Sequence, residues 1–155
     1  MKYELAKNTK MHFGTKLFQV RALVSFGNVD AGELGGWVKA EKNLSQEGDA
    51  WVYGDARVYG DACVYGDARV SGNSNLMWFS KVGSENGTLT AVRSKDGGIL
   101  VARGCFLGTI DEFAAAVEKR HGTSQVGEEY RLLIQVIRLR LGVAVEQRHS
   151  CGRVA

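Results

Sequence analysis

A six-residue motif repeats without interruption from Val52 and constrains the fold more than any other feature of the sequence. The units are Val-Tyr-Gly-Asp-Ala-Arg, Val-Tyr-Gly-Asp-Ala-Cys, a second Val-Tyr-Gly-Asp-Ala-Arg and a weaker Val-Ser-Gly-Asn-Ser-Asn that ends at Asn75. Such a repeat is interpreted first, because each unit is a supersecondary element that buries its apolar face only against neighbouring copies.

The pattern within each unit predicts a short strand followed by a tight turn, or corner. Small or aliphatic side chains alternate with long polar or aromatic ones, which is the period of a half-buried strand. The corners are Gly54-Asp55, Gly60-Asp61 and Gly66-Asp67, and this residue pair tolerates the positive φ of a tight turn. Short strands joined by such corners predict a coil of stacked parallel strands, a parallel β-helix.

The period of six can be traced beyond the obvious repeats. Counting in steps of six from the first residue of the motif places Gln46, Ala40 and Leu34 at the same inward position before the repeats, and Leu76 and Val82 after them. Gln46 is the one strongly polar residue in this series. We therefore expect the coil to continue well to either side of the repeats that look alike.

The repeats resemble the hexapeptide-repeat family, in which three units make one turn of a triangular, left-handed β-helix. The left hand is implied by the resemblance, because parallel crossover connections are otherwise right-handed. The flanking modules, Gly27–Val38 before the repeats and Lys95-Asp-Gly and Arg103-Gly-Cys-Phe after them, are similar in order to small hexapeptide-repeat proteins common in phage and prophage genomes. That group offers no activity that can be carried over to particular residues.

The fold class predicted from these patterns is mainly β, a short left-handed parallel β-helix with appended elements. Residues 1–33 are expected to form an N-terminal β cap over the open end of the coil. Residues 34–83 are expected to form the β-helix, with two to three turns, and residues 84–155 a C-terminal β-hairpin and helical module with a short tail.

The C-terminal module carries clear local signals. Asp-Gly between two apolar runs, Gly87–Arg93 and Ile99–Phe106, predicts a hairpin. Thr109-Ile-Asp-Glu112 is a capping box that begins a helix, and His121-Gly122 ends it. A second helix is expected from about Gln125 to Leu141, although Ile134–Val145 also alternates like a strand. The tail from Val145 shows no pattern.

Composition limits the cellular setting and the partners. The net charge is only +3 and acidic and basic residues are mixed, so electrostatics give no argument for a nucleic-acid partner. Cys63, Cys105 and Cys151 show no metal-site spacing. No apolar run suits a signal peptide or a membrane span. A reduced cytoplasm is the expected compartment, that of the host cell if the protein is phage-encoded, with no membrane partner.

Catalytic and metal-binding candidates are weak. The best-known hexapeptide-repeat proteins are acyltransferases that use acyl-CoA and a histidine base, but here His12 precedes the repeats, and His121 and His149 follow them. Cys63 has no histidine near it in the repeat that would activate it as a nucleophile. Scattered histidines do not predict a zinc site, and the corner aspartates serve the turns. We therefore expect no catalytic residue, metal or cofactor.

The outward-facing side chains of the repeats are the best binding candidates. Aromatic residues and arginine are enriched at interface cores, although such residues also pack on one another as ordinary strand formers. A turn of three units distributes the tyrosines one to each wall, so they form no ladder. The candidates for ligand or interface contact are Trp51, Tyr53, Arg57, Tyr59, Tyr65 and Arg69.

These features predict a non-enzymatic, oligomeric binding protein. The resemblance implies a trimer of parallel prisms, and a groove between prisms that carries tyrosine and arginine suits a small anionic or nucleotide-like ligand. A host protein is the other expected partner, which would fit an anti-defence role for a phage or prophage protein. The alternatives are an acyl-CoA-dependent acyltransferase and a structural or assembly protein with no ligand.

Overall fold

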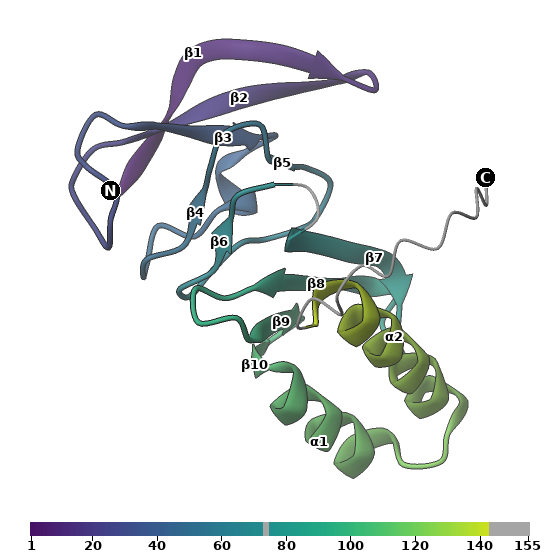
Figure 1. Cartoon of the computed structure of the whole chain (residues 1–155). Coiled ribbons are helices and arrows are strands. Elements are labelled where there is room, and N and C mark those ends of the chain that lie inside the picture. Colours follow the sequence, from purple (N-terminus) through teal and green to yellow (C-terminus); the bar gives the residue numbers. More distant parts are fainter. Residues whose placement is uncertain (73–74, 143–155) are drawn as a thin grey trace, which may run out of the picture.

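The computed structural model describes residues 1–72 and 75–142, and its elements lie in three layers (Figure 1). An N-terminal sheet and the repeat segment form the first layer. A C-terminal antiparallel sheet forms the second, and helices α1 and α2 cover its far face. The unpatterned tail, with His149 and Cys151, lies outside the described residues.

The N-terminal part begins with a long antiparallel hairpin. Strand β1 (Tyr3–His12) pairs antiparallel with β2 (Thr15–Ala22), and β2 pairs antiparallel with β3 (Leu34–Val38). The first of these strands was not predicted. β3 then pairs in parallel with β5 (Arg57–Val58), which joins the hairpin to the repeats.

The predicted left-handed parallel β-helix is wrong. The repeats give only two-residue strands: β4 (Trp51–Val52) pairs in parallel with β6 (Arg69–Val70), β3 pairs in parallel with β5, and Leu44 forms an isolated parallel bridge with Val64. After β6 the chain enters an antiparallel strand instead of a further turn. The described chain is a mixed α and β protein whose longer strands pair antiparallel.

A two-residue insertion explains why the period of six failed before the repeats. Trp51 pairs with Arg69, eighteen positions away, whereas Trp37 pairs with Arg57, twenty positions away. The extra residues lie between Leu44 and Trp51. Leu44, 1% exposed, therefore takes the inward position that the sequence pattern assigned to residue 46.

Two other positions in the predicted inward series also face elsewhere. Leu34 is 48% exposed. The Gln46 amide caps the first strand: its Oε1 accepts from the Lys2 amide at 2.8 Å, and its Nε2 donates to the Tyr3 carbonyl at 3.1 Å. The polar residue that seemed an exception in the coil is thus a hydrogen-bonding partner of β1.

The C-terminal sheet is an antiparallel meander in the order β10-β9-β8-β7. Its strands are β7 (Leu76–Val82), β8 (Gly87–Arg93), β9 (Ile99–Arg103) and β10 (Phe106–Thr109). The Asp-Gly hairpin between β8 and β9 is confirmed. The predicted strand Ile99–Phe106 is interrupted, because the chain reverses at Gly104, where φ is +58°.

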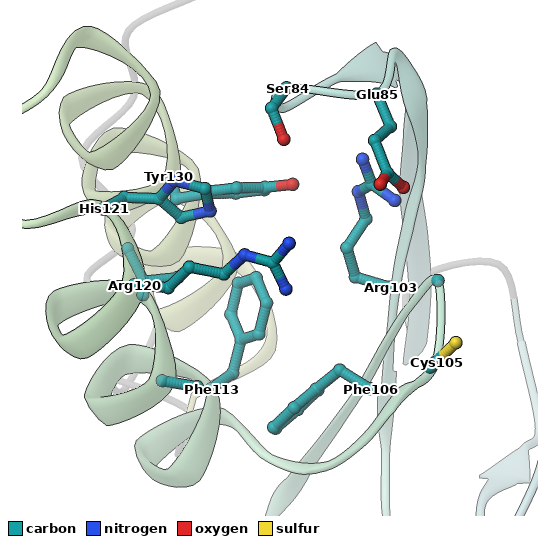
Figure 2. Close-up of a pocket in the computed structure, with 12 residues that line it drawn as sticks. Ser84, Glu85, Arg103, Cys105, Phe106, Phe113, Arg120, His121 and Tyr130 are labelled. Carbon is teal, nitrogen blue, oxygen red and sulfur yellow. The ribbon is translucent and has the colours of Figure 1, made fainter.

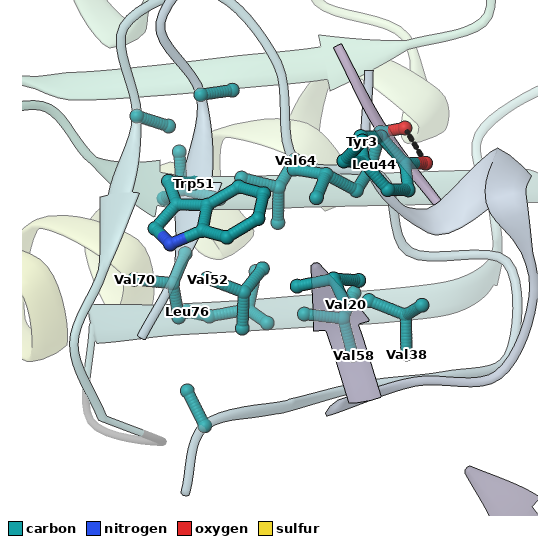
Figure 3. Packing of buried hydrophobic residues seen from close by; sticks show 14 of the residues in the cluster. Tyr3, Val20, Val38, Leu44, Trp51, Val52, Val58, Val64, Val70 and Leu76 are labelled. Carbon is teal, nitrogen blue, oxygen red and sulfur yellow. Dashed lines mark hydrogen bonds between the residues drawn. The ribbon is translucent and has the colours of Figure 1, made fainter. Parts of the chain in front are cut away.

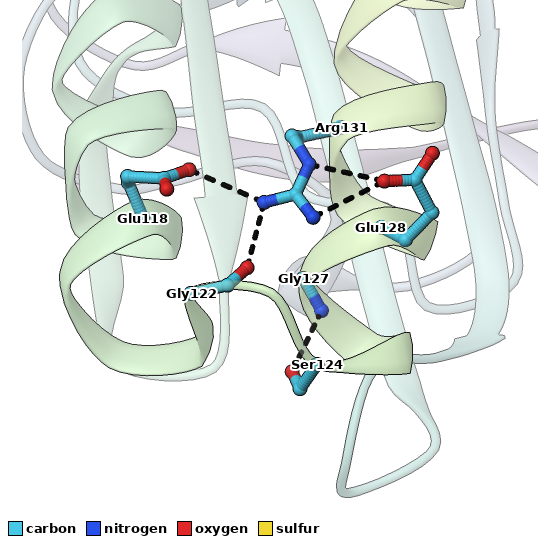
Figure 4. Close-up of polar contacts among 6 residues, drawn as sticks. All are labelled: Glu118, Gly122, Ser124, Gly127, Glu128 and Arg131. Carbon is cyan, nitrogen blue, oxygen red and sulfur yellow. Dashed lines mark hydrogen bonds and ion pairs between the residues drawn. The ribbon is translucent and has the colours of Figure 1, made fainter.

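Both predicted helices are confirmed, as α1 (Ile110–His121) and α2 (Gln125–Leu141). The Thr109 hydroxyl accepts from the Glu112 amide at 3.2 Å, and the Glu112 carboxylate accepts from the Thr109 amide at 2.8 Å. Arg131 ties the two helices together: it donates to the Gly122 carbonyl at 2.7 Å and pairs with Glu118 and Glu128 (Figure 4).

The C-terminal sheet is buried on both faces. On β8, Leu89 and Ala91 face the core shared with the helices, whereas Val92 faces the core shared with the repeats. Figure 3 shows the second of these cores, in which the Trp51 ring lies among repeat valines. The sheet therefore connects the repeat segment to the helix pair. One cavity lies between the sheet and the helices, and another lies between the sheet and the repeats.

Candidate functional site

A cavity of about 250 Å³ lies where α1 and α2 meet two turns of the C-terminal sheet (Figure 2). We call it the helix pocket. One wall comes from the β7–β8 turn with Ser84 and Glu85, from the end of β9 with Arg103 and from the β9–β10 turn with Cys105. The opposite wall comes from α1 with Arg120 and His121 and from α2 with Tyr130.

The floor of the helix pocket is aromatic. Phe106 and Phe113 have ring centroids 5.2 Å apart, and Phe113 meets Tyr130 edge to face at 5.4 Å. Phe113 and Tyr130 are 4% exposed and belong to the core under the helices. The floor is thus a fixed apolar surface, suited to a planar or branched apolar group.

Cationic side chains converge above this floor. The Arg120 guanidinium reaches across the cavity from α1 (Figure 2), and within residues 1–72 and 75–142 it has neither an ion pair nor a hydrogen bond. Arg103 donates through Nη2 to the Val82 carbonyl at 3.0 Å, while its buried Nε has no partner among the described residues. Glu85 is the carboxylate lining the pocket, so the two guanidiniums leave it with net positive charge.

Hydroxyl and imidazole groups complete the polar rim. The Tyr130 and Ser84 hydroxyls point into the cavity in Figure 2. The His121 ring, at the C-terminal end of α1, lies 5.7 Å from the Tyr130 ring. Hydrogen-bond donors therefore face the cavity from both walls, an arrangement that suits an anion.

Glycine makes room for these groups at two positions. A Cβ at Gly83 would overlap the Tyr130 hydroxyl, and one at Gly87 would overlap the Arg103 guanidinium. Gly83 also has a φ of +74°, and its amide donates to the Glu129 carboxylate at 2.5 Å. The β7–β8 turn is therefore shaped around the side chains that line the pocket.

The sequence candidates lie elsewhere, and two of them do not face outward. Trp51 is 0% exposed and packs between Tyr3 and Phe26, and Tyr65 is 8% exposed. The expectation that these two rings are exposed is wrong, because the N-terminal hairpin covers one and the C-terminal sheet the other. Tyr65 lines a cavity shared with Leu100 of β9.

The remaining candidates separate into two pairs. The Arg69 guanidinium donates to the Tyr53 hydroxyl at 3.4 Å. Arg57 and Tyr59 line a third cavity with His12, and the His12 ring lies 5.3 Å from that of Tyr59. The sequence pattern missed this histidine, because nothing in the spacing showed that the hairpin folds back on the repeats. Whether any candidate contacts a ligand or a second subunit stays a prediction.

The cysteines and possible metal ligands of the described residues are spread over the structure. Within them, no group of three or more His, Cys, Asp or Glu is placed to hold a metal ion. Burial raises the pKa of the Cys63 thiol, which disfavours the reactive thiolate. Cys105 turns away from His121 in the helix pocket (Figure 2), so these two do not form a nucleophile–base pair.

The comparisons with known proteins add no family. No protein-family model matches the chain, and a search of curated proteins finds no match. In the described part of the chain, no helix is long and apolar enough to cross a membrane.

Proposed function

We propose that this protein is a non-enzymatic binding protein for a small anion that carries an apolar ring, and that the helix pocket is its site. The observation that carries the proposal is the exposed Arg120 guanidinium, which lies over an aromatic floor and has no partner among the described residues. The planar guanidinium of an arginine can donate two parallel hydrogen bonds to a carboxylate or phosphate, and here it lies beside apolar rings that can take the rest of the ligand.

The size of the pocket limits the ligand. A cavity of about 250 Å³ is at the small end of ligand sites, so it suits one ring with one anionic group better than an extended chain. The ring would lie on Phe106 and Phe113. The anion would receive charge-assisted hydrogen bonds from Arg120, and Arg103 would add positive charge to the opposite wall.

The test compares ring-bearing and ring-free anions. Phenyl phosphate and adenosine monophosphate should raise the melting temperature and bind in calorimetry, and inorganic phosphate should bind more weakly because it leaves the aromatic floor exposed. Arg120→Gln should weaken phenyl phosphate binding by about 1.5–3 kcal/mol, the usual contribution of a hydrogen bond to a charged group. Arg140→Gln on the exposed face of α2 is the matched control.

Three results would contradict the proposal. The first is equal affinity of the Arg120→Gln variant and the wild type for phenyl phosphate. The second is a shift that only acetyl-CoA produces, accompanied by acyl transfer, which would favour the transferase alternative. No shift with any of these anions would leave the helix pocket without a ligand of this class and would favour a structural role.

A further inference from the structure

The tip of the β1–β2 hairpin has an unusual residue in its turn. His12 pairs with Thr15 across the two-residue loop Phe13-Gly14, and φ is +45° at Phe13 and +75° at Gly14. This is the geometry of a type I′ turn, which favours Asn-Gly. Phe13 is also 92% exposed. Neither turn chemistry nor burial explains a phenylalanine here, and strained backbone of this kind is often found at functional sites.

Phe13 begins a row of aromatic rings that runs from the hairpin tip across the repeats to β7. The ring centroids of Phe13 and His12 are 4.5 Å apart, those of His12 and Tyr59 are 5.3 Å apart, and those of Tyr59 and Trp78 are 4.9 Å apart. These rings line a cavity of about 450 Å³, which we call the aromatic groove, together with Arg57 and Leu76.

The surroundings of the aromatic groove are basic. Residues 6–19 of the hairpin contain three lysines and no acidic residue. Lys10 shares the hairpin face of His12, whereas Lys16 lies on the opposite face over the Phe18 ring. Lys39 follows β3, which pairs in parallel with β5, so this lysine lies level with Tyr59. Asp55 faces Lys10 at 3.4 Å and is the one carboxylate that pairs with this hairpin half within the described residues.

We propose that the aromatic groove binds single-stranded nucleic acid. Bases would stack on Phe13, Tyr59 and Trp78, and phosphates would contact Lys10 and Lys39, as in other proteins that bind single strands without reading their sequence. The small net charge of the whole chain is not an argument against this, because the distribution of basic residues decides such binding. The proposal concerns a site separate from the helix pocket.

The shape of the site favours a nucleic acid over a lipid surface. A membrane would contact the convex hairpin tip, where Phe13 and Met11 are exposed. The row of rings continues inward from that tip to Trp78, and this inner part would have no role in membrane contact. Successive bases of a flexible strand can occupy both parts.

The decisive variant is Phe13→Asn. Asparagine suits the type I′ turn, so the melting temperature should be equal to or higher than that of the wild type. Binding of a fluorescein-labelled oligothymidylate of about 12 nucleotides, measured by fluorescence anisotropy, should nevertheless weaken by roughly 5- to 100-fold through the loss of one stacked base. Improved folding with weakened binding separates a stacking role from a structural one.

The electrostatic part is tested by salt dependence. Lys39→Gln, an exposed lysine level with Tyr59, should lower the slope of log affinity against log salt by about 0.7, the value for one phosphate contact on a single strand. Lys119→Gln, an exposed lysine on α1, is the matched control and should leave the slope unchanged. Arg120→Gln should bind the oligonucleotide as the wild type does, so the two sites can fail independently.

Three outcomes would overturn the proposal. They are the absence of oligonucleotide binding by the wild type at about 50 mM salt, where such contacts are strong, an unchanged affinity of the Phe13→Asn variant, and an unchanged salt slope in Lys39→Gln. Phe13-dependent binding to phosphatidylserine vesicles without oligonucleotide binding would also reject it, and would assign the hairpin tip to a membrane surface.

Discussion

At the scale of residues, two buried tyrosines show that a hydroxyl adds to the free energy of unfolding only where it has a hydrogen-bond partner. The Tyr3 hydroxyl donates to the Leu44 carbonyl at 2.6 Å and lies 2.9 Å from that of Glu41. The Tyr65 hydroxyl is buried without a hydrogen-bond partner among the described residues. Tyr3→Phe should therefore lower the free energy of unfolding by about 1–3 kcal/mol, whereas Tyr65→Phe should be neutral or stabilising by up to ~1 kcal/mol. Urea denaturation checks both, and equal losses would contradict the assignment.

The same tyrosines predict a loss of stability in alkali. Burial raises the pKa of both Tyr3 and Tyr65 above the ordinary value. Above about pH 10 the unfolded chain loses these protons while the folded chain keeps them, so stability falls as pH rises, by up to ~1.4 kcal/mol per pH unit for each tyrosine. Tyr65→Phe removes one such group, and its advantage over the wild type should grow from pH 9 to pH 11 (about one unit to either side of the ordinary value). A constant difference would refute this.

Other buried polar residues could not be predicted from the sequence. Asn43 is 0% exposed, and its amide donates to the carbonyls of Gly60 and Ala62 at 3.2 and 2.7 Å. The Lys2 ammonium donates to three carbonyls of residues 47, 48 and 50. Lys2 bonds the carbonyl of Ala50, 48 positions away, and Asn43 bonds that of Gly60, 17 positions away. No local sequence pattern contains information about partners at such separations.

At the scale of elements, the signals that succeeded were local ones. The capping box at Thr109 and the Asp-Gly turn act within a few residues, and both form as predicted. The repeat failed as a guide because its strands are two residues long and their pairing depends on distant partners. The helix pocket could not be anticipated, since Arg103 and Arg120 meet only after the sheet and the helices pack.

Arg131 links α1 to α2, and its contribution to stability can be measured. Its planar guanidinium bonds Gly122, Glu118 and Glu128 at once, and a lysine ammonium cannot span that set. Arg131→Lys should therefore cost about 1–2 kcal/mol in chemical denaturation, from the loss of hydrogen bonds to charged groups. Arg140→Lys, exposed on the same helix, is the control. A cost no larger than that of the control would show that the ion pairs are only surface contacts.

At the scale of the whole molecule, the C-terminal sheet couples two cores. Leu89 on β8 packs with the helices and Val92 on the same strand packs with the repeats, so neither core is complete without this strand. The sequence predicted separate cap, coil and C-terminal parts. Shared packing on β8 instead predicts that the repeat layer and the helix layer unfold together, as small cooperative domains do.

Ile137→Ala tests this coupling. Ile137 is 0% exposed in the core under the helices, and its truncation should cost about 2–5 kcal/mol. Tryptophan fluorescence reports the N-terminal sheet, the repeats and β7, which carry Trp37, Trp51 and Trp78. Far-ultraviolet circular dichroism reports α1 and α2. Both probes should shift by the same amount in denaturant, and Leu139→Ala, 86% exposed on the same helix, should shift neither. If the helices melted first while the tryptophan signal kept its wild-type midpoint, β8 would join two independent units, and the helix pocket would be free to open without disturbing the repeats.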